Sequence, residues 1–229
     1  MRILITGFDP FDGESTNPSW EAVKLLPDTI NGAEIIKMEI PTVFSKAGNF
    51  IIEKIEEINP HAVISIGQAG GRATITPEFI GINFVNARIP DNEGEQPIGN
   101  VSEYGPDGIF STLPVETMVE RMKEEKIPAS ISYTAGTYVC NHVLYTVLEY
   151  IKANKLKTKA GFIHVPYIPS QVLDKPVGTP SMDLSLIVKG LELSIGVVVE
   201  ILNMNIQTLE SFELNMLVEE LEMQFGSDF

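Results

Sequence analysis

The sequence predicts an α/β domain built on a largely parallel β-sheet. Short apolar runs rich in β-branched residues alternate along the chain with stretches in which apolar residues recur three and four positions apart. These are the patterns of buried strands and amphipathic helices, and Gly and Pro residues separate the segments. A chain of 229 residues is also long enough to bury the core of one compact domain without disulfide bonds.

The apolar runs are expected to form the strands, and the amphipathic stretches the helices that cover them. The predicted strands are Arg2–Thr6, Glu34–Ile40, Ala62–Gly67, Ile131–Thr134 and Lys159–Val165. The predicted helices are Asn17–Leu26, Ser45–Ile58, Leu113–Glu125, Cys140–Ala153 and a further helix from Met182 to about Leu202, for which Ser181 can serve as the N-cap.

Residues 70–110 differ from the rest of the chain because they are rich in Gly, Pro, Asn and Asp. Within them, Thr74–Asn86 can form an antiparallel excursion. A long irregular insertion on a compact domain usually carries function, so we expect it to contribute to a site.

The net charge of −15 is unevenly distributed along the chain. No basic residue follows Lys189, whereas eight acidic residues do. We therefore predict a single α/β domain over residues 1–202 and an acidic C-terminal extension, 203–229, that can form a short amphipathic helix. So negative a chain is a poor partner for nucleic acids, whose phosphates are bound by clustered Lys and Arg.

Composition argues against several other classes of protein. A single cysteine cannot form an internal disulfide, which favours a reducing compartment and hence the cytoplasm. The N-terminal apolar stretch is too short for a signal peptide, and no segment approaches the roughly 18 to 20 apolar residues of a membrane span. Cysteine and histidine do not cluster with metal-ligand spacing, so a zinc site is not expected.

Cys140 is the candidate nucleophile because of its position at the start of a predicted helix. The positive end of the helix dipole there favours thiolate over thiol, and the unpaired backbone N–H groups could bind an oxyanion.

Among the three histidines, His164 is the only one placed to act as the base. His142 lies two residues from Cys140, so the two side chains point about 200° apart on a helix. His61 precedes its strand, whereas active sites of open α/β sheets lie at the carboxyl ends of strands. His164 is near the carboxyl end of its strand and so on the same sheet edge as Cys140; the alternative is a core histidine satisfied by hydrogen bonds.

A carboxylate would orient the histidine of such a pair, but sequence spacing does not select one. The candidates in suitable loops are Glu78, Asp91, Glu93, Asp9 and Asp12.

Five spaced blocks give the sequence a recognisable pattern. They are Gly7–Phe11 with Asn17–Trp20, Ile66–Arg72 leading to Pro77 and Glu78, Asn86–Asn92, Gly136–Asn141, and Gly161–Tyr167. In these blocks the chain resembles the pyroglutamyl-peptidase I (pyrrolidone-carboxylate peptidase) family of cysteine peptidases, over about residues 1–202.

The resemblance implies a Cys-His-Glu triad of Cys140 as nucleophile, His164 as base and then acid, and Glu78 as the partner of the imidazole. It also implies that Arg88 and the backbone N–H of Cys140 lie at the developing oxyanion. The implied activity is removal of an N-terminal 5-oxoprolyl residue from peptides, without cofactor or metal, by a cytoplasmic homotetramer. The implied fold is a three-layer sandwich with a twisted, mostly parallel mixed sheet, similar to the nucleoside phosphorylases.

A 5-oxoprolyl group is a neutral lactam, so its pocket needs apolar walls and a few hydrogen bonds. Phe8, Phe11 and Tyr138 can supply walls, although core packing is the alternative for the two phenylalanines, and Gln68 can present backbone polar groups. By similarity, Thr42, Ile89 and Val139 occupy further pocket positions. Tyr138 stands where the family more often has Phe, and its hydroxyl needs a partner.

Two other functions remain open from the sequence. The first is a phosphorylase-like nucleoside enzyme in which Gly67–Arg72 holds phosphate, although that run lacks the spacings of known phosphate-binding motifs. The second is a non-catalytic acidic binding module, against which the complete Glu78, Cys140 and His164 set argues.

Overall fold

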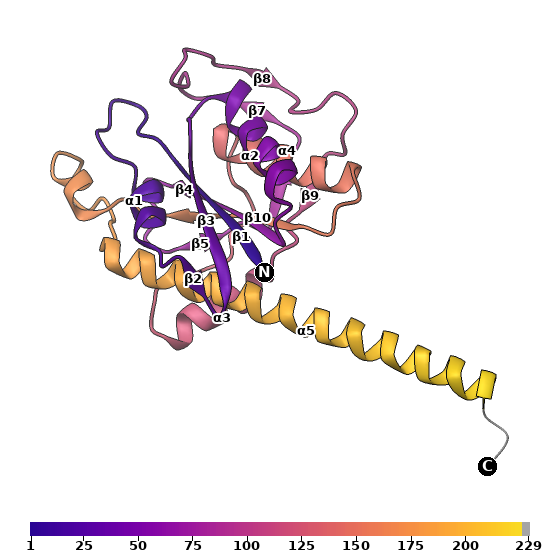
Figure 1. Cartoon of the computed structure of the whole chain (residues 1–229). Helices are drawn as coiled ribbons and strands as arrows, with labels where there is room; N and C mark the ends of the chain where they lie inside the picture. The colour runs from indigo at the N-terminus through magenta and orange to yellow at the C-terminus, as the bar shows by residue number, and fades with distance from the viewer. Residues whose placement is uncertain (226–229) are drawn as a thin grey trace.

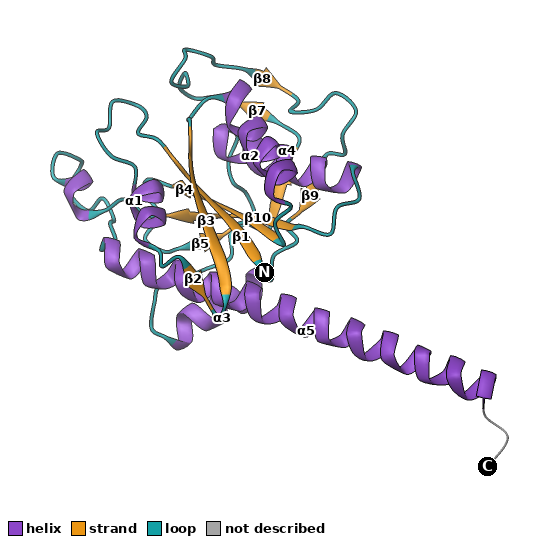
Figure 2. Ribbon diagram, viewed as in Figure 1, coloured by secondary structure: helices purple, strands orange, loops and turns teal. Residues whose placement is uncertain are grey.

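The computed structural model describes residues 1–225, with side chains described as far as Thr208 (Figures 1 and 2). Its largest sheet has the strand order β2-β3-β1-β4-β10-β5. The strands are β1 (Arg2–Phe8), β2 (Thr29–Ile30), β3 (Ala33–Ile40), β4 (Ala62–Gln68), β5 (Thr76–Pro77) and β10 (Lys159–Val165). The four long strands run parallel, and the two short edge strands are antiparallel to their neighbours. The predicted α/β class and mostly parallel mixed sheet are confirmed.

Helices cover both faces of this sheet. They are α1 (Pro18–Leu25), α2 (Phe44–Ile58), α3 (Val115–Glu124), α4 (Val139–Ala153) and α5 (Leu184–Phe225), with a short 3₁₀ helix at Pro169–Val172. Side chains alternate across a strand, so Ile3 and Ile5 of β1 pack in one core with α1, α3 and α5, whereas Leu4 packs in the other with α2 and α4. The result is three layers, helix, sheet and helix. The likeness to nucleoside phosphorylases stays a prediction.

The insertion between β4 and α3 contains short antiparallel strands. β6 (Ile80–Ile82) pairs with β9 (Gly108–Phe110), and β7 (Val85–Asn86) pairs with β8 (Ile98–Gly99). The antiparallel character predicted for Thr74–Asn86 is confirmed, but its strands pair with β10, β9 and β8 rather than with one another.

Two local predictions were wrong. Ile131–Thr134 is not a strand: Ser132 forms an isolated bridge to Glu78, and a second isolated bridge, between Ile75 and Ala129, lies just before the segment. Pro77 lies between these bridges and has no N–H to donate, which interrupts a ladder. The last helix begins at Leu184, and Asp183 rather than Ser181 caps it by accepting the N–H of Ser185 at 2.9 Å.

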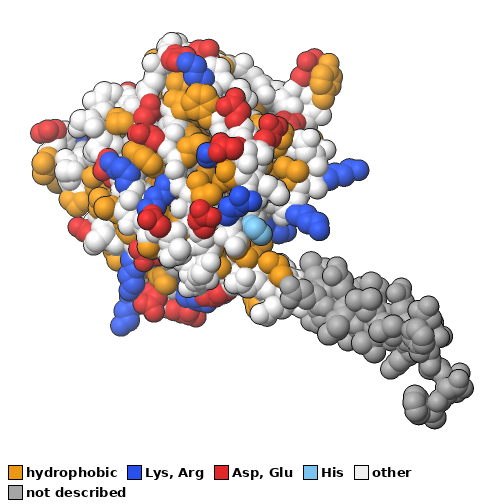
Figure 3. All heavy atoms as spheres, viewed as in Figure 1, with side chains coloured by type: hydrophobic (Ala, Val, Ile, Leu, Met, Phe, Trp, Pro, Cys, Tyr) orange, Lys and Arg blue, Asp and Glu red, His pale blue; other side chains and the backbone are white. Residues whose placement is uncertain are grey.

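Helix α5 continues without a break to Phe225, so it crosses the predicted boundary at residue 202. Residues 226–229 of the predicted extension, and its side chains from residue 209 on, lie outside the described residues; the domain division stays a prediction. Within residues 1–225, no helix, α5 included, is both long and apolar enough to cross a membrane. On the face drawn in Figure 3, acidic and basic side chains are interspersed over the body.

Candidate active site

Cys140 and His164 line the same pocket, which lies where three parallel strands end. Phe8 is the last residue of β1, Gln68 the last of β4, and His164 the last but one of β10. The pocket has a volume of about 340 Å³. Its lining comprises Phe8, Phe11, Asn17, Thr42, Gln68, Ala69, Gly70, Arg72, Arg88, Ala135, Gly136, Tyr138, Cys140 and His164. The carboxyl edge of the sheet therefore brings the predicted nucleophile and base together.

Glu78 is the carboxylate that contacts His164. Its Oε1 lies 2.7 Å from His164 Nδ1, and both side chains are buried. The placement follows from β5 folding back along β10, because the Glu78 N–H donates to the Phe162 carbonyl at 2.8 Å. An ionised carboxylate can only accept, so Nδ1 carries the hydrogen and Nε2 is the ring nitrogen left for another partner.

The charge state of Glu78 is set by competing effects. Burial favours the neutral acid, but the hydrogen bond and charge of His164, followed by Ser132 and Arg72, outweigh it and lower the pKa of Glu78. The hydrogen bonds to Glu78 itself come from His164 and Arg72, because the Ser132 hydroxyl donates to the Thr134 carbonyl at 3.0 Å. Glu78 is thus held as a carboxylate in a fully buried position.

Arg72 is a site residue that the sequence reasoning did not single out. Its Nη1 donates to Glu78 Oε1 at 2.7 Å and to Thr76 Oγ1 at 2.6 Å, and its Nη2 donates to the Thr134 carbonyl at 3.2 Å. The sequence signal was only a basic residue at the end of a glycine-rich run, and its partner became apparent with the path of β5.

Cys140 is the second residue of α4, and the thiol is half-buried. Asn141 fixes this end of the helix, because its buried side chain accepts the Ile82 N–H and donates to the Ile82 and Phe84 carbonyls at 2.9 to 3.0 Å. Burial raises the pKa of the Cys140 thiol to about 12, with the negative charge of Glu78 adding to the effect and Arg72 opposing it. The expected stabilisation of the thiolate by the helix N-terminus is therefore outweighed.

The predicted substrate-pocket residues divide into three groups. Phe8, Phe11, Thr42, Gln68 and Tyr138 line the pocket with Cys140, as does Arg88, which is exposed. Ile89 lines an adjoining hollow that shares Phe11, Gln68, Arg88 and Tyr138 with it. Val139 is fully buried and lines neither hollow.

The side chain of Tyr138 forms a wall of the pocket. Its ring centroid lies 6.0 Å from that of Phe11 and 5.3 Å from that of Phe44, with which it forms a T-shaped pair. Its hydroxyl donates to the Pro90 carbonyl at 3.0 Å. The hydroxyl that distinguishes this residue from Phe is therefore satisfied by the backbone.

Comparisons with known proteins agree with this arrangement. The pyroglutamyl peptidase family model matches residues 1–201. The chain belongs to the pyroglutamyl peptidase family. A pyrrolidone-carboxylate peptidase of Clostridium perfringens is 59% identical over 200 residues, which are 87% of this chain and 93% of that protein.

Solved structures of the family share the fold. Pyroglutamyl peptidase I from Bacillus amyloliquefaciens superposes with a TM-score of 0.82 at 46% identity, over 86% of this chain and 96% of that one. A mutant pyrrolidone carboxyl peptidase from Pyrococcus furiosus gives 0.85 at 38% identity, over 88% and 100% of the two chains. The family match ends inside α5, so it leaves out the rest of that helix.

The remaining candidate carboxylates contact other groups. Asp91 accepts the N–H groups of Phe44, Glu93 and Glu95 at 2.9 Å, Glu93 pairs with Lys46, and Asp9 accepts the Thr42 N–H at 2.7 Å. Asp12 lines the adjoining hollow with Ile89.

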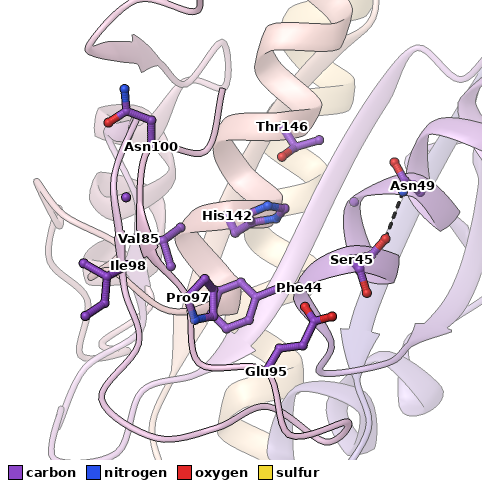
Figure 4. Close-up of a pocket in the computed structure, with 12 residues that line it drawn as sticks. Phe44, Ser45, Asn49, Val85, Glu95, Pro97, Ile98, Asn100, His142 and Thr146 are labelled. Carbon is purple, nitrogen blue, oxygen red and sulfur yellow. Dashed lines mark hydrogen bonds between the residues drawn. The ribbon is translucent and has the colours of Figure 1, made fainter. Parts of the chain in front are cut away.

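The side chains of the other two histidines do not line the pocket with Cys140. His61 is exposed at the amino-terminal end of β4, where its Nδ1 accepts the Arg2 N–H at 3.2 Å. His142 faces a separate hollow of about 380 Å³ between α2, α4 and the β7–β8 pair (Figure 4). Burial lowers the pKa of His142, and the edge of Phe44 packs against its ring.

Proposed function

We propose that this protein hydrolyses the bond that follows an N-terminal 5-oxoprolyl (pyroglutamyl) residue of a peptide. The supporting observation is that Cys140 and His164 line one pocket while Glu78 holds the far side of the imidazole. The family match includes all three residues, and its relatives bear the names of pyrrolidone-carboxylate peptidases.

In the proposed first step, His164 removes the thiol proton as Cys140 attacks the 5-oxoprolyl carbonyl. The base is needed at that moment, because a thiol with a pKa of about 12 is almost entirely protonated at neutral pH. Glu78 stabilises the imidazolium that forms and fixes its orientation, the part that an aspartate plays in serine triads.

The carbonyl oxygen gains negative charge as the thiol adds. We assign its stabilisation to the Cys140 N–H and Arg88. The N–H lies in the first turn of α4, whose donors have no acceptor within the helix, and Arg88 brings a cation to the same pocket.

The intermediate then breaks its C–N bond, and the imidazolium of His164 gives its proton to the leaving amine. A water molecule, deprotonated by the same imidazole, attacks the thioester and releases pyroglutamate and the free thiol. The cycle needs no group beyond the chain's own side chains and water.

The pocket lining also supports the choice of a blocked N-terminus. It holds Arg72 and Arg88 but no Asp or Glu side chain. A free amino terminus would bring an ammonium group near the Arg88 guanidinium with no carboxylate in the lining to pair with it, whereas a lactam is neutral. Phe8, Phe11 and Tyr138 supply flat apolar walls, and we assign Thr42, Gln68, Ile89 and Val139 to the remaining contacts with the ring or its support.

The test is release of the aniline from a 5-oxoprolyl anilide, with the matched prolyl anilide as the control substrate. Both have a five-membered ring, but only the prolyl ring carries a protonated amine. We expect turnover of the first, little of the second, and loss of turnover in Cys140→Ala and after alkylation with iodoacetamide. Full activity of Cys140→Ala would refute the proposal.

The nucleoside alternative is less well supported by the site. Phosphate bound at Gly67–Arg72 would need the Arg72 guanidinium, which is already committed to Glu78, Thr76 and the Thr134 carbonyl. Phosphate-dependent nucleoside cleavage that survives alkylation would revive this alternative.

We further propose that the enzyme acts as a cytoplasmic homotetramer, as the family resemblance implies. A cluster of aromatic side chains at the surface supports self-association. In this cluster Phe110 and Tyr133, which are 62% and 68% exposed, both pack on Phe79. Analytical ultracentrifugation tests the proposal, and a monomer at micromolar concentration would contradict it.

A further inference from the structure

The Arg72 side chain joins three segments that meet at the candidate active site. It starts from the turn after β4, reaches Thr76 on β5 and Glu78 just beyond that strand, and ends on the Thr134 carbonyl in the segment that leads to Cys140. Each contact is within hydrogen-bond distance, and the side chain is 30% exposed while that of Glu78 is fully buried. One guanidinium group therefore links the β5 segment that carries Glu78 to the segment that precedes Cys140.

Arg72 and His164 share the same oxygen of Glu78. Both contact Oε1 at 2.7 Å, whereas Oε2 is buried and has no hydrogen-bond partner among the described residues. A planar guanidinium is permanently charged and its donors have fixed directions. The Arg72 guanidinium therefore fixes the position of Oε1 and stabilises the negative charge on that oxygen. The hydrogen bond from Nδ1 to Oε1 in turn orients the His164 ring.

We propose that Arg72 is a positioning residue of the reaction, which acts through Glu78 to hold His164 with Nδ1 protonated and Nε2 facing Cys140. The proposal rests on the proposed function and assigns a residue that the triad does not include. Arg72 also brings positive charge near the thiol, which partly offsets the increase in the pKa of Cys140 that burial and the charge of Glu78 cause.

The test compares Arg72→Gln, Arg72→Lys and the control Arg121→Gln. Arg121 is a matched arginine, because it makes a two-pronged ion pair with Glu200 at 3.0 and 3.2 Å, has a similar exposure of 35%, and joins α3 to α5 away from the pocket. Each variant is assayed for kcat and KM on a 5-oxoprolyl anilide across pH, for thermal stability, and for the rate of Cys140 alkylation by iodoacetamide.

Arg72→Gln should lower kcat about 10- to 100-fold, the effect of misplacing a reacting group by about 1 Å, with little change in KM. The acid limb of the pH profile should move to higher pH, because loss of the positive charge makes Glu78 easier to protonate. Alkylation at a given pH should become slower. Arg72→Lys should restore the acid limb but only part of kcat, since lysine keeps the charge and loses the fork.

Three outcomes would overturn the inference in different ways. Wild-type kcat and acid limb in folded Arg72→Gln would show that Arg72 is not needed. Equal losses in both Arg72 variants, with an unshifted acid limb and melting temperatures lowered as in Arg121→Gln, would show that it only braces the fold. A wild-type protein without turnover would instead refute the proposed function, and with it the reaction that Arg72 serves.

Discussion

Gly67→Ala tests how closely β4 packs beneath the nucleophile. Gly67 lies opposite His164 in the register of β4 and β10. A Cβ at this position would lie 2.6 and 2.7 Å from Cζ and Cε1 of Phe162, and 3.0 Å from Cys140 Sγ. Carbon atoms pack at about 3.5 to 4.0 Å. The Phe162 ring would therefore have to move by about 1 Å, and the thiol by a few tenths.

These displacements set the expected size of the effect. Overpacking of this kind costs about 1 to 3 kcal/mol of unfolding free energy, and displacement of a reacting group by up to about 1 Å costs as much as about 100-fold in rate. We expect kcat of Gly67→Ala to fall about 10- to 100-fold. KM should change less, because the three atoms nearest to the new methyl group belong to Phe162 and Cys140 and not to the proposed ring-binding walls Phe11 and Tyr138.

The assay is hydrolysis of a 5-oxoprolyl anilide, with urea unfolding measured on the same preparations. Gly196→Ala is the matched control, because its Cβ in α5 would meet first the Asn31 side-chain amide, at 3.2 Å, and this exposed side chain can move away by the few tenths of an ångström that are needed. It should keep wild-type kcat and gain up to about 1 kcal/mol in stability, as alanine does over glycine in a helix. Wild-type kcat in folded Gly67→Ala would refute the close packing of β4 on the nucleophile.

Three further predictions concern the surrounding residues. Burial raises the pKa of Asp91, but hydrogen bonds from the backbone N–H groups of Phe44 and of residues 93–95 outweigh burial and lower the pKa. The Asp91 carboxylate therefore stabilises the fold above the unfolded-state pKa of about 3.9. This stabilisation is lost as the pH falls through the lower pKa of the folded state. In urea unfolding measured across pH, the unfolding free energy of Asp91→Asn should be roughly 2 kcal/mol below that of the wild type at pH 7, and the two should converge at the most acidic pH. A difference that does not change with pH would contradict this. Since burial raises the pKa of Cys140 to about 12, the rate of its alkylation by iodoacetamide should still be rising above about pH 9, and a plateau near neutral pH would show a preformed thiolate. Tyr138→Phe loses the bond to the Pro90 carbonyl and should cost about 1 kcal/mol in thermal unfolding, while kcat/KM stays within about fivefold; a larger loss would mean that the hydroxyl touches the substrate.

The long elements of the fold could be predicted from the sequence because each is buried or amphipathic over many residues. The strand Lys159–Val165 has the predicted bounds, and α2 begins one residue earlier than expected. Strands of two residues, such as β5, are too short to show a period. The end of the last helix was also missed, because residues 203–208 contain no Gly or Pro that would stop it.

The site was predictable as far as it depends on the long parallel strands. Cys140 and His164 meet because β10 and the start of α4 both reach the carboxyl edge of the sheet. Glu78 could not be selected by spacing, because a two-residue strand that turns back along β10 brings it to His164. Arg72 depends on that same turn, so both polar partners became evident only once the path of β5 was known.

The pKa of the Cys140 thiol differs in direction from what its place at a helix N-terminus predicts. A helix N-terminus favours a negative charge by about 0.3 to 2 kcal/mol. Raising the thiol pKa from 9.0 to about 12 corresponds to roughly 4 kcal/mol against the thiolate, so burial and the charge of Glu78 exceed what the helix supplies. A thiol that is protonated at neutral pH leaves His164 as the group that must take its proton. A thiol that is protonated until it reacts depends on a correctly oriented base. The contacts of His164 with Glu78, and of Glu78 with Arg72, therefore matter more for the reaction than the helix dipole at Cys140.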